Sequence, residues 1–399
     1  MDDVKYIAYA IPVFFVLIAI EWLWTRDKGN YRLADAINNL SCGVMQQLTT
    51  LFMRTALFAG YVWIFTSFRQ FELSMNRPLV WVVCFLAVDF MYYWFHRLSH
   101  EINALWAAHV VHHQSEDYNL AVALRQSSFQ GIFSSFFYWP LAWIGFPPGM
   151  FLALSAANTL YQFWIHTQAI DRMGPFEWLF NTPSHHRVHH GRNPIYIDRN
   201  HGGTLIIWDR LFGTFQKETE PVVYGITTPL ASWNPLWANF HYWVELWQSA
   251  RTTSRWRDKV RVFTKAPGWF PQDMGGFKPP PPVSHVPAKY GPELTPEFKI
   301  YIWAQFAWLV MATFVFLFQF QRYEWAVQAS FTLWVLVGLW AIGGLSENKR
   351  AFRWVELVRL LLWLPLVWPY FSFAWVWGPF AVLLLSWMTL LRPKAFATA

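Results

Sequence analysis

Charged residues and cysteines are scarce in this chain. Asp, Glu, Lys and Arg make up only 14% of its 399 residues, and the two cysteines, Cys42 and Cys84, both lie inside apolar segments. So few cysteines argue against a disulfide scaffold or a zinc site built on cysteine. The net charge of +7 comes from Lys and Arg residues that are scattered between apolar runs. Because they form no basic stripe, the sequence does not predict nucleic-acid binding.

Apolar and aromatic residues are abundant instead. Hydrophobic residues make up 55% of the chain, Trp, Phe and Tyr make up 20%, and the mean hydropathy is +0.21. Aromatic rings suit the boundary between water and lipid, where an apolar body can carry a polar edge. The composition therefore predicts an integral membrane protein.

Long apolar runs separated by polar links predict an all-α, multi-pass membrane protein. The first run, residues 6–24, is expected to be a membrane anchor, because no small-residue cleavage site of a signal peptide follows it. A helical hairpin is predicted for residues 132–144 and 150–165, which flank a Gly-Phe-Pro-Pro-Gly turn. The other predicted spans are residues 40–65, 79–95, 300–320, 324–344, 355–371 and 373–391.

These runs divide the chain into three predicted parts. Residues 1–78 hold the first membrane spans, and residues 79–298 hold a histidine-rich core with the hairpin and a more polar cap. Residues 299–399 are expected to form a C-terminal helical bundle.

The positions of the cations predict the orientation in the membrane. Clusters at residues 26–32, 349–353 and 392–394 can all face the cytoplasm together, as positively charged loops usually do. The same arrangement places the histidine-rich core on the cytoplasmic side. Arg69 and Arg77 are the exception, because they then face outward.

Histidine spacing is the strongest chemical signal in the sequence. Eleven of the thirteen histidines lie between residues 96 and 201, as H-R-L-S-H at 96–100, H-V-V-H-H at 109–113, H-R-V-H-H at 186–190, and outlying residues. Helical residues three and four apart share one face, so each motif can present two or three imidazoles together. The candidate metal ligands are His96, His100, His109, His112, His113, His166, His186, His189 and His190.

That many imidazoles predict two metal ions. A tetrahedral zinc uses only about four ligands, whereas two ions with four or five ligands each would use all of these histidines. Imidazole suits zinc, copper, iron and nickel alike, so the residues by themselves do not name the metal.

Several polar residues near the motifs are candidates for supporting roles. Asp89 lies seven residues before His96 on the same helical face and can orient an imidazole, and intramembrane acids are usually functional. Glu101 is a candidate for proton relay or ligand anchoring, or is a solvated charge. Asn158 either bonds His166 or makes an ordinary interhelical hydrogen bond. His185 and His201 are expected beside the ligands or at the surface rather than as ligands, whereas His241 and His285 lie far from the motifs in the sequence.

The three motifs resemble the histidine boxes of the fatty acid hydroxylase and sterol desaturase superfamily. The sequence that flanks the motifs is more specific, and it is similar to that of the ether-cleaving branch of the superfamily. It comprises Y-Y-W-F-H-R at 92–97, N-T-P-S-H-H-R-V-H-H-G-R-N-P at 181–194 and G-G-T-L-I-I-W-D-R-L-F-G-T-F at 202–215. His201 departs from the pattern, in which a tyrosine is expected before the Gly pair.

The resemblance implies a reaction and its cofactors. It implies two iron ions, O2, and tetrahydrobiopterin or a related reduced pterin with a recycling system or other electron donor. The implied reaction hydroxylates the ether-bearing carbon of a 1-O-alkylglycerol or lyso-ether lipid, and the product breaks into fatty aldehyde and a glycerol derivative. Glu101 and Asp89 are the candidate catalytic residues. The implied membrane is the bacterial inner membrane or the endoplasmic reticulum.

Two alternatives remain open at this stage. Within the superfamily, the chain can be a hydroxylase or desaturase of a fatty acyl, sterol or aminolipid chain. From another class, it can be a metal or proton transporter, which would place ionisable groups along a pathway through the membrane.

Overall fold

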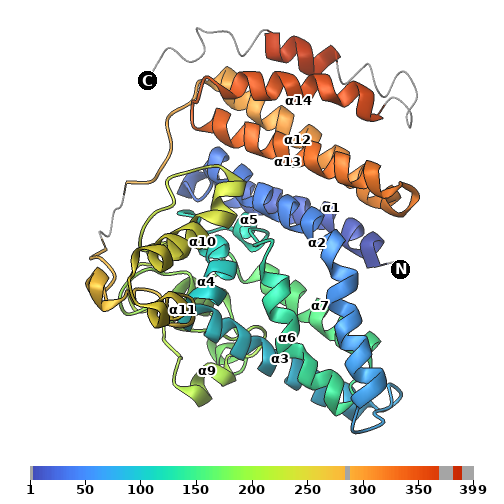
Figure 1. The fold of residues 1–399 in the computed structure, drawn as a ribbon, viewed down its shortest axis with the longest axis vertical. Coiled ribbons are helices and arrows are strands. Elements are labelled where there is room, and N and C mark those ends of the chain that lie inside the picture. The colour runs from blue at the N-terminus through green and yellow to red at the C-terminus, as the bar shows by residue number, and fades with distance from the viewer. Residues whose placement is uncertain (1–2, 284–287, 368–380, 389–399) are drawn as a thin grey trace.

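The computed structural model describes residues 3–283, 288–367 and 381–388, and these are almost entirely helical (Figure 1). Within the described residues the only β-structure is two isolated bridges, Phe180 with Leu205 and Gly191 with Tyr224. The predicted all-α fold is therefore confirmed.

Nine α-helices of the described chain have more than ten residues. They are α1 (Asp3–Thr25), α2 (Leu33–Phe68), α3 (Pro78–Glu101), α6 (Gln130–Ile144), α7 (Pro148–Trp164), α10 (Pro235–Thr252), α12 (Pro296–Gln319), α13 (Trp325–Ser346) and α14 (Phe352–Val367). The shorter α-helices are α4 (Asn103–His109), α5 (Leu120–Ala123), α8 (Pro183–His189), α9 (Ile207–Phe212) and α11 (Trp256–Thr264). The 3-10 helices are η1 (Arg26–Lys28), η2 (Val110–His113), η3 (Gly174–Trp178), η4 (Gln272–Met274) and η5 (Phe320–Arg322).

Four helical segments are long and apolar enough to cross a membrane: Leu33–Phe68, Pro78–Glu101, Pro296–Arg322 and Trp325–Ser346. They contain the predicted spans at 40–65, 79–95 and 300–320 and all but the first residue of the one at 324–344, and α1 contains the run at 6–24. Two of these helices begin with residues that commonly start helices. Pro78 and Pro296 occupy first helical turns, where the missing amide hydrogen costs nothing, and the Thr295 hydroxyl accepts from the amide of Phe298.

The last two predicted spans are only partly described. Residues 355–367 of the first are helical in α14, and residues 381–388 of the second are helical. The remaining residues of both, 368–371, 373–380 and 389–391, lie outside the described residues.

The predicted hairpin is formed by α6 and α7. Gly145 ends α6 with a φ of +119°, and a Cβ at this position would lie only 2.0 Å from the carbonyl oxygen of Phe71. Only glycine satisfies both conditions. The two helices have 15 and 17 residues, shorter than the roughly 20 that a full crossing needs.

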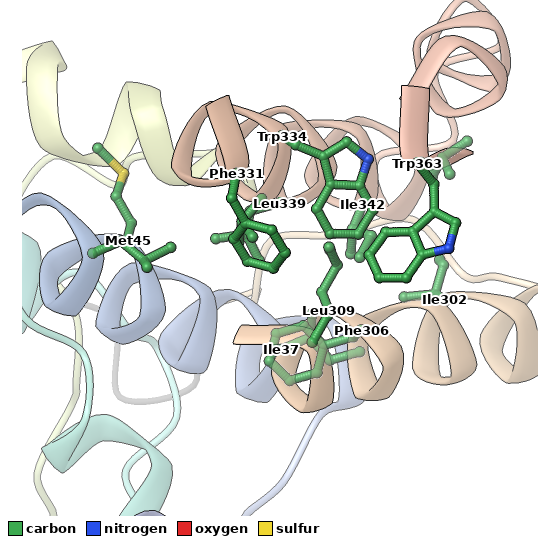
Figure 2. Packing of buried hydrophobic residues seen from close by; sticks show 14 of the residues in the cluster. Ile37, Met45, Ile302, Phe306, Leu309, Phe331, Trp334, Leu339, Ile342 and Trp363 are labelled. Atoms are coloured by element: carbon green, nitrogen blue, oxygen red, sulfur yellow. The ribbon is translucent and has the colours of Figure 1, made fainter. Parts of the chain in front are cut away.

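Helix α2 connects the two halves of the molecule. Its N-terminal half contributes Ile37, Met45 and Leu48 to a buried cluster with α12, α13 and Trp363 of α14, and Figure 2 shows Ile37 and Met45 within this packing. Its C-terminal half packs Tyr61 against Phe151 of α7, in a second cluster with α3 and α6. The C-terminal helices therefore lie on one side of α1 and α2, and the histidine-bearing helices lie on the other (Figure 1).

Candidate metal centre

The fold brings all nine predicted ligands together in two buried groups. The five-histidine group contains His96, His100, His109, His113 and His189, and the four-histidine group contains His112, His166, His186 and His190. Within each group, one nitrogen of every ring lies within 4.8 Å of those of the other rings. The groups adjoin each other, because the rings of His113 and His190 stack with centroids 4.4 Å apart.

Each H-x-x-H-H motif divides between the two groups. His109 and His113 enter the five-histidine group, whereas His112 enters the four-histidine group. His186 and His190 enter the four-histidine group, whereas His189 enters the other. In each motif, the two histidines four residues apart therefore lie in one group, and the middle histidine lies in the other.

Five secondary-structure elements position these side chains. The last two turns of α3 carry His96 and His100, and α4 ends at His109. The 3-10 helix η2 carries His112 and His113, and α8 carries His186 and His189. His166 follows the end of α7, so the hairpin places one of the candidate ligands.

Hydrogen bonds to oxygen fix the orientation of five rings. The Nδ1 atom of His96 bonds the carbonyl of His201 (2.8 Å), and that of His112 bonds the carbonyl of Arg125 (2.9 Å). Three further Nδ1 atoms have equivalent partners: His109 with Gln130 Oε1, His166 with the carbonyl of Gln162, and His189 with the carbonyl of Arg199. A proton held on Nδ1 leaves a lone pair on Nε2, which is the atom that faces the centre of each group.

The nitrogen lone pairs need a cation between them. Nε2 of His96 lies 3.1 Å from Nε2 of His109, and Nε2 of His112 lies 3.1 Å from Nε2 of His166. Since all four rings hold their protons on Nδ1, each pair places two acceptors face to face. In addition, Nε2 of His100, His189 and His190 is buried without a hydrogen-bond partner in the described part of the chain. The residues present therefore fit bound metal ions.

Burial also keeps the imidazoles uncharged. It lowers the pKa of His109 to about 4 and that of His166 to about 4. The pKa of His112, His186 and His190 is lowered well below the ordinary value, first by burial and then by neighbouring imidazoles. Neutral rings at physiological pH are the form that ligates metals.

Two carboxylates hold the chain segment that supports His96. Asp209 accepts from the amides of His201 and Gly202, both at 2.7 Å, and so fixes the carbonyl that bonds His96. Asp209 was not predicted from the sequence. Its place inside the apolar run L-I-I-W-D-R-L is the same signal that drew attention to Asp89.

Asp89 supports the same segment from the other side. It accepts from the amides of Thr204 and Leu205 and from Trp208 Nε1, at 2.8, 3.1 and 2.9 Å. Asn158 Nδ2 also donates to Asp89 (2.6 Å). Of the two roles predicted for Asn158, the structure therefore shows the interhelical hydrogen bond and not the bond to His166. Asp89 therefore bonds this loop and Asn158 of α7, and an imidazole is not among its hydrogen-bond partners in the described chain.

Glu101 lies at the end of α3 and pairs with Arg97 (Nε to Oε1, 2.9 Å). Its side chain is 40% exposed, which favours the solvated-charge alternative over an anchor for a ligand. The carboxylate nearest a histidine ring of this region is instead that of Asp198, with Oδ1 3.5 Å from His100 Nδ1.

The other described histidines lie outside the two groups. His201 is fully buried beside the five-histidine group, with its ring centroid 5.0 Å from that of His100, and neither ring nitrogen has a hydrogen-bond partner among the described residues. His185 packs against Phe215, and His241 bonds the carbonyl of Ala238. His285 lies outside the described residues.

A cavity of about 410 Å³ opens beside the metal centre. His109 of one group and His112 and His166 of the other line it. Its volume falls within the range of about 300–1,000 Å³ that is usual for small-molecule sites. The cavity thus provides room for an organic ligand next to histidines of both groups.

Comparison with known proteins agrees with this chemistry. The family model for fatty acid hydroxylases matches residues 81–214, which contain all nine histidines of the two groups. No solved structure matches the chain significantly.

Curated relatives match far more of the chain. An alkylglycerol monooxygenase of Xenopus tropicalis is 40% identical over 91% of this chain and 82% of its own length. The human alkylglycerol monooxygenase is 40% identical over 90% of this chain and 82% of its own length. An ornithine lipid hydroxylase of Rhizobium tropici is 31% identical, but over only 55% of this chain and 69% of its own length.

Proposed function

The chain belongs to the alkylglycerol monooxygenase family, and from this membership we propose that it oxidises the ether bond of 1-O-alkylglycerols or lyso-ether lipids within a membrane. The observation that carries the proposal is the cavity lined by His109, His112 and His166. It lets one organic substrate reach both histidine groups at once.

We infer that the two groups bind two iron ions. The five-histidine group would hold one ion and the four-histidine group the other. When bound, the iron would supply the oxidising chemistry, with O2 as the oxidant and tetrahydrobiopterin or a related reduced pterin as the source of electrons. The protein's own part is to keep the imidazoles neutral, to orient them through their Nδ1 bonds and to exclude water with buried walls.

The substrate carbon that reacts is the one attached to the ether oxygen. Hydroxylation there consumes O2 and two electrons, releases water and gives a hemiacetal. The hemiacetal then breaks into fatty aldehyde and a glycerol derivative. Placing this carbon beside the histidines lets the alkyl tail remain in an apolar environment.

The site is proposed to face the cytoplasm. The cation clusters after α1 and around residue 350 support this orientation, since such loops are usually retained on the cytoplasmic side. Either the bacterial inner membrane or the endoplasmic reticulum satisfies the same argument.

A transporter is not favoured by the arrangement of the histidines. Transport requires ionisable groups spaced along a path through the bilayer. Here the nine imidazoles instead converge within two adjoining groups.

The test is a product assay with purified protein. We expect fatty aldehyde and glycerol to appear together from a 1-O-alkylglycerol, only when O2 and reduced pterin are both supplied. Anaerobic and pterin-free samples serve as controls. Mass spectrometry that finds an intact ether with an added hydroxyl or a new double bond would move the protein to the hydroxylase or desaturase alternative, as would turnover of an aminolipid alone.

A further inference from the structure

The cavity beside the metal centre extends well beyond the histidines. Its lining includes Phe14 of α1 and Val310 and Phe314 of α12, in addition to His109 and His166. Helix α12 packs against α1 and α2. In Figure 1 it lies above these two helices, whereas the histidine-bearing helix α4 lies below them. The cavity therefore runs from the metal centre to the C-terminal helices.

The chemistry of the lining changes along this path. Near the histidines it offers neutral amides, because Gln130 bonds His109 and Gln162 bonds His166 through its carbonyl. Where α1 meets α12 it is mostly apolar, with Ile11, Phe14, Phe15, Val310, Phe314 and Leu317, and Thr313 is the one polar residue that these two helices contribute. None of the residues that line the cavity in the described chain is Asp, Glu, Lys or Arg.

This gradient matches a lipid with an uncharged polar head and one alkyl tail. The amides can bond hydroxyl groups next to the reacting carbon, and the apolar end removes methylene groups from water. A head at the opposite end would find the Thr313 hydroxyl as the only polar side chain that α1 and α12 offer, and its other polar groups would lie among phenylalanines.

We propose that the space between α1 and α12 is the alkyl-tail subsite, and that Val310 and Phe314 set the tail length that the protein accepts. This inference rests on the proposed function. Both helices lie outside residues 81–214, the part that matches the general fatty acid hydroxylase model. Tail selection would thus reside in segments added to the shared histidine-bearing domain.

The first test is a competition among 1-O-alkylglycerols of graded chain length, with the aldehydes measured together by mass spectrometry. Val310→Trp should shift the preference toward shorter tails. The aldehyde ratio of long to short tails should fall by about fourfold for each methylene group that the cavity can no longer bury. Phe314→Ala should shift it toward longer tails. The matched control is Met311→Trp, because Met311 is the neighbour of Val310 on α12 but is 56% exposed.

The ratios among aldehydes do not depend on the yield of folded protein. A shift in opposite directions for the two cavity variants, with no shift in the control, supports the subsite. Unchanged ratios in both cavity variants, or the same shift in Met311→Trp, would overturn it.

A second test does not require turnover. A 1-O-alkylglycerol with a diazirine at the end of its tail is bound to the full-length protein and activated by light. We expect the label on peptides of α1 or α12, and loss of the label when unmodified alkylglycerol competes. A label confined to α8, α9 or the polar cap would overturn the subsite. If the label falls on α12 but no aldehyde forms, the subsite stands and the proposed reaction fails.

Discussion

Single histidine side chains carry the proposed chemistry, and each can be tested. His189 belongs to the five-histidine group. Its Nε2 atom is buried and has no hydrogen-bond partner in the described chain. Replacing His189 with Ala should lower the iron content from about two ions per chain and reduce aldehyde release by more than about 100-fold. His241→Ala is the control, because His241 is buried outside both groups. Full iron content and turnover in the His189 variant would remove it from the proposed ligands, and one zinc without iron in the parent protein would contradict the di-iron proposal.

Glu101 offers a clear separation between a catalytic and a structural role. Its ion pair with Arg97 is partly exposed, so Glu101→Gln should change the free energy of unfolding by no more than about 0.5 kcal/mol. If the pair is only a surface contact, iron content and turnover should both stay within about twofold of the parent protein. Turnover that falls strongly while iron is retained would instead support the catalytic role proposed for Glu101.

His201 is the position at which this chain departs from the expected tyrosine. Its backbone amide bonds Asp209 and its carbonyl bonds His96, and neither contact depends on the side chain. The ring nitrogens make no hydrogen bond to the described residues, so removing them breaks none. We therefore expect His201→Tyr to retain aldehyde release that depends on reduced pterin and O2. Product mass spectra that show an intact, hydroxylated ether would contradict this expectation.

At the scale of elements, the loop between α8 and α9 is held by two carboxylates. Asp89 anchors its Thr204 and Leu205 amides, and Asp209 anchors the amides of His201 and Gly202. Space is tight here as well, because a Cβ on Gly203 would lie 2.8 Å from Asn158 Oδ1 and 3.0 Å from Asp89 Oδ1. The loop therefore has little freedom to move the carbonyl of His201 away from His96.

Replacing Asp89 with Asn tests this positioning role. An amide can accept at only one of the two oxygen positions. Two donors therefore lose their acceptor in either orientation: Leu205 and Trp208 at one oxygen, or Thr204 and Asn158 at the other. Each bond to a buried charged group is worth about 1.5–3 kcal/mol, so we expect a clearly lower unfolding temperature. We expect iron to remain bound in the folded fraction. A stable variant without turnover would instead favour the direct catalytic role that the sequence suggested.

At the scale of the whole molecule, the orientation in the membrane is open to direct measurement. Cysteines introduced near Lys28, Arg192 and Lys349 should all react with an impermeant reagent from the cytoplasmic side, and one near Arg77 from the opposite side. The natural Cys42 and Cys84 are buried and free, so they should contribute little background. Labelling of the first three sites from different sides would contradict the shared cytoplasmic face.

The division into three parts also belongs to this scale and stays a proposal. Helix α2 packs against α12 and α13 at one end and against α6 at the other. Together with the cavity that reaches α12, this packing joins the C-terminal helices to the site physically. A boundary near residue 299 would therefore divide the chain in sequence, but the C-terminal helices would not be a structurally independent domain.

Features that depend on neighbouring residues could be predicted from the sequence alone. Apolar runs predicted most of the long helices, and the glycines and prolines at 145–149 predicted the hairpin. Histidine spacing predicted eight residues of the two groups, and the position of His166 at the end of the hairpin predicted the ninth. These signals are local, because helix formation and the sharing of a helical face depend on residues a few positions apart.

Only the tertiary structure decided how the histidines are shared. Positions three and four along a helix point about 100° apart, so one motif can serve two groups, but the sequence does not say where each group lies. The carbonyls that orient His96, His112 and His189 come from residues 201, 125 and 199, and a backbone carbonyl leaves no mark in the sequence. The cavity between α1 and α12 is likewise formed by residues some 300 positions apart. Contacts between distant segments, which no local pattern encodes, therefore determined the geometry of the site.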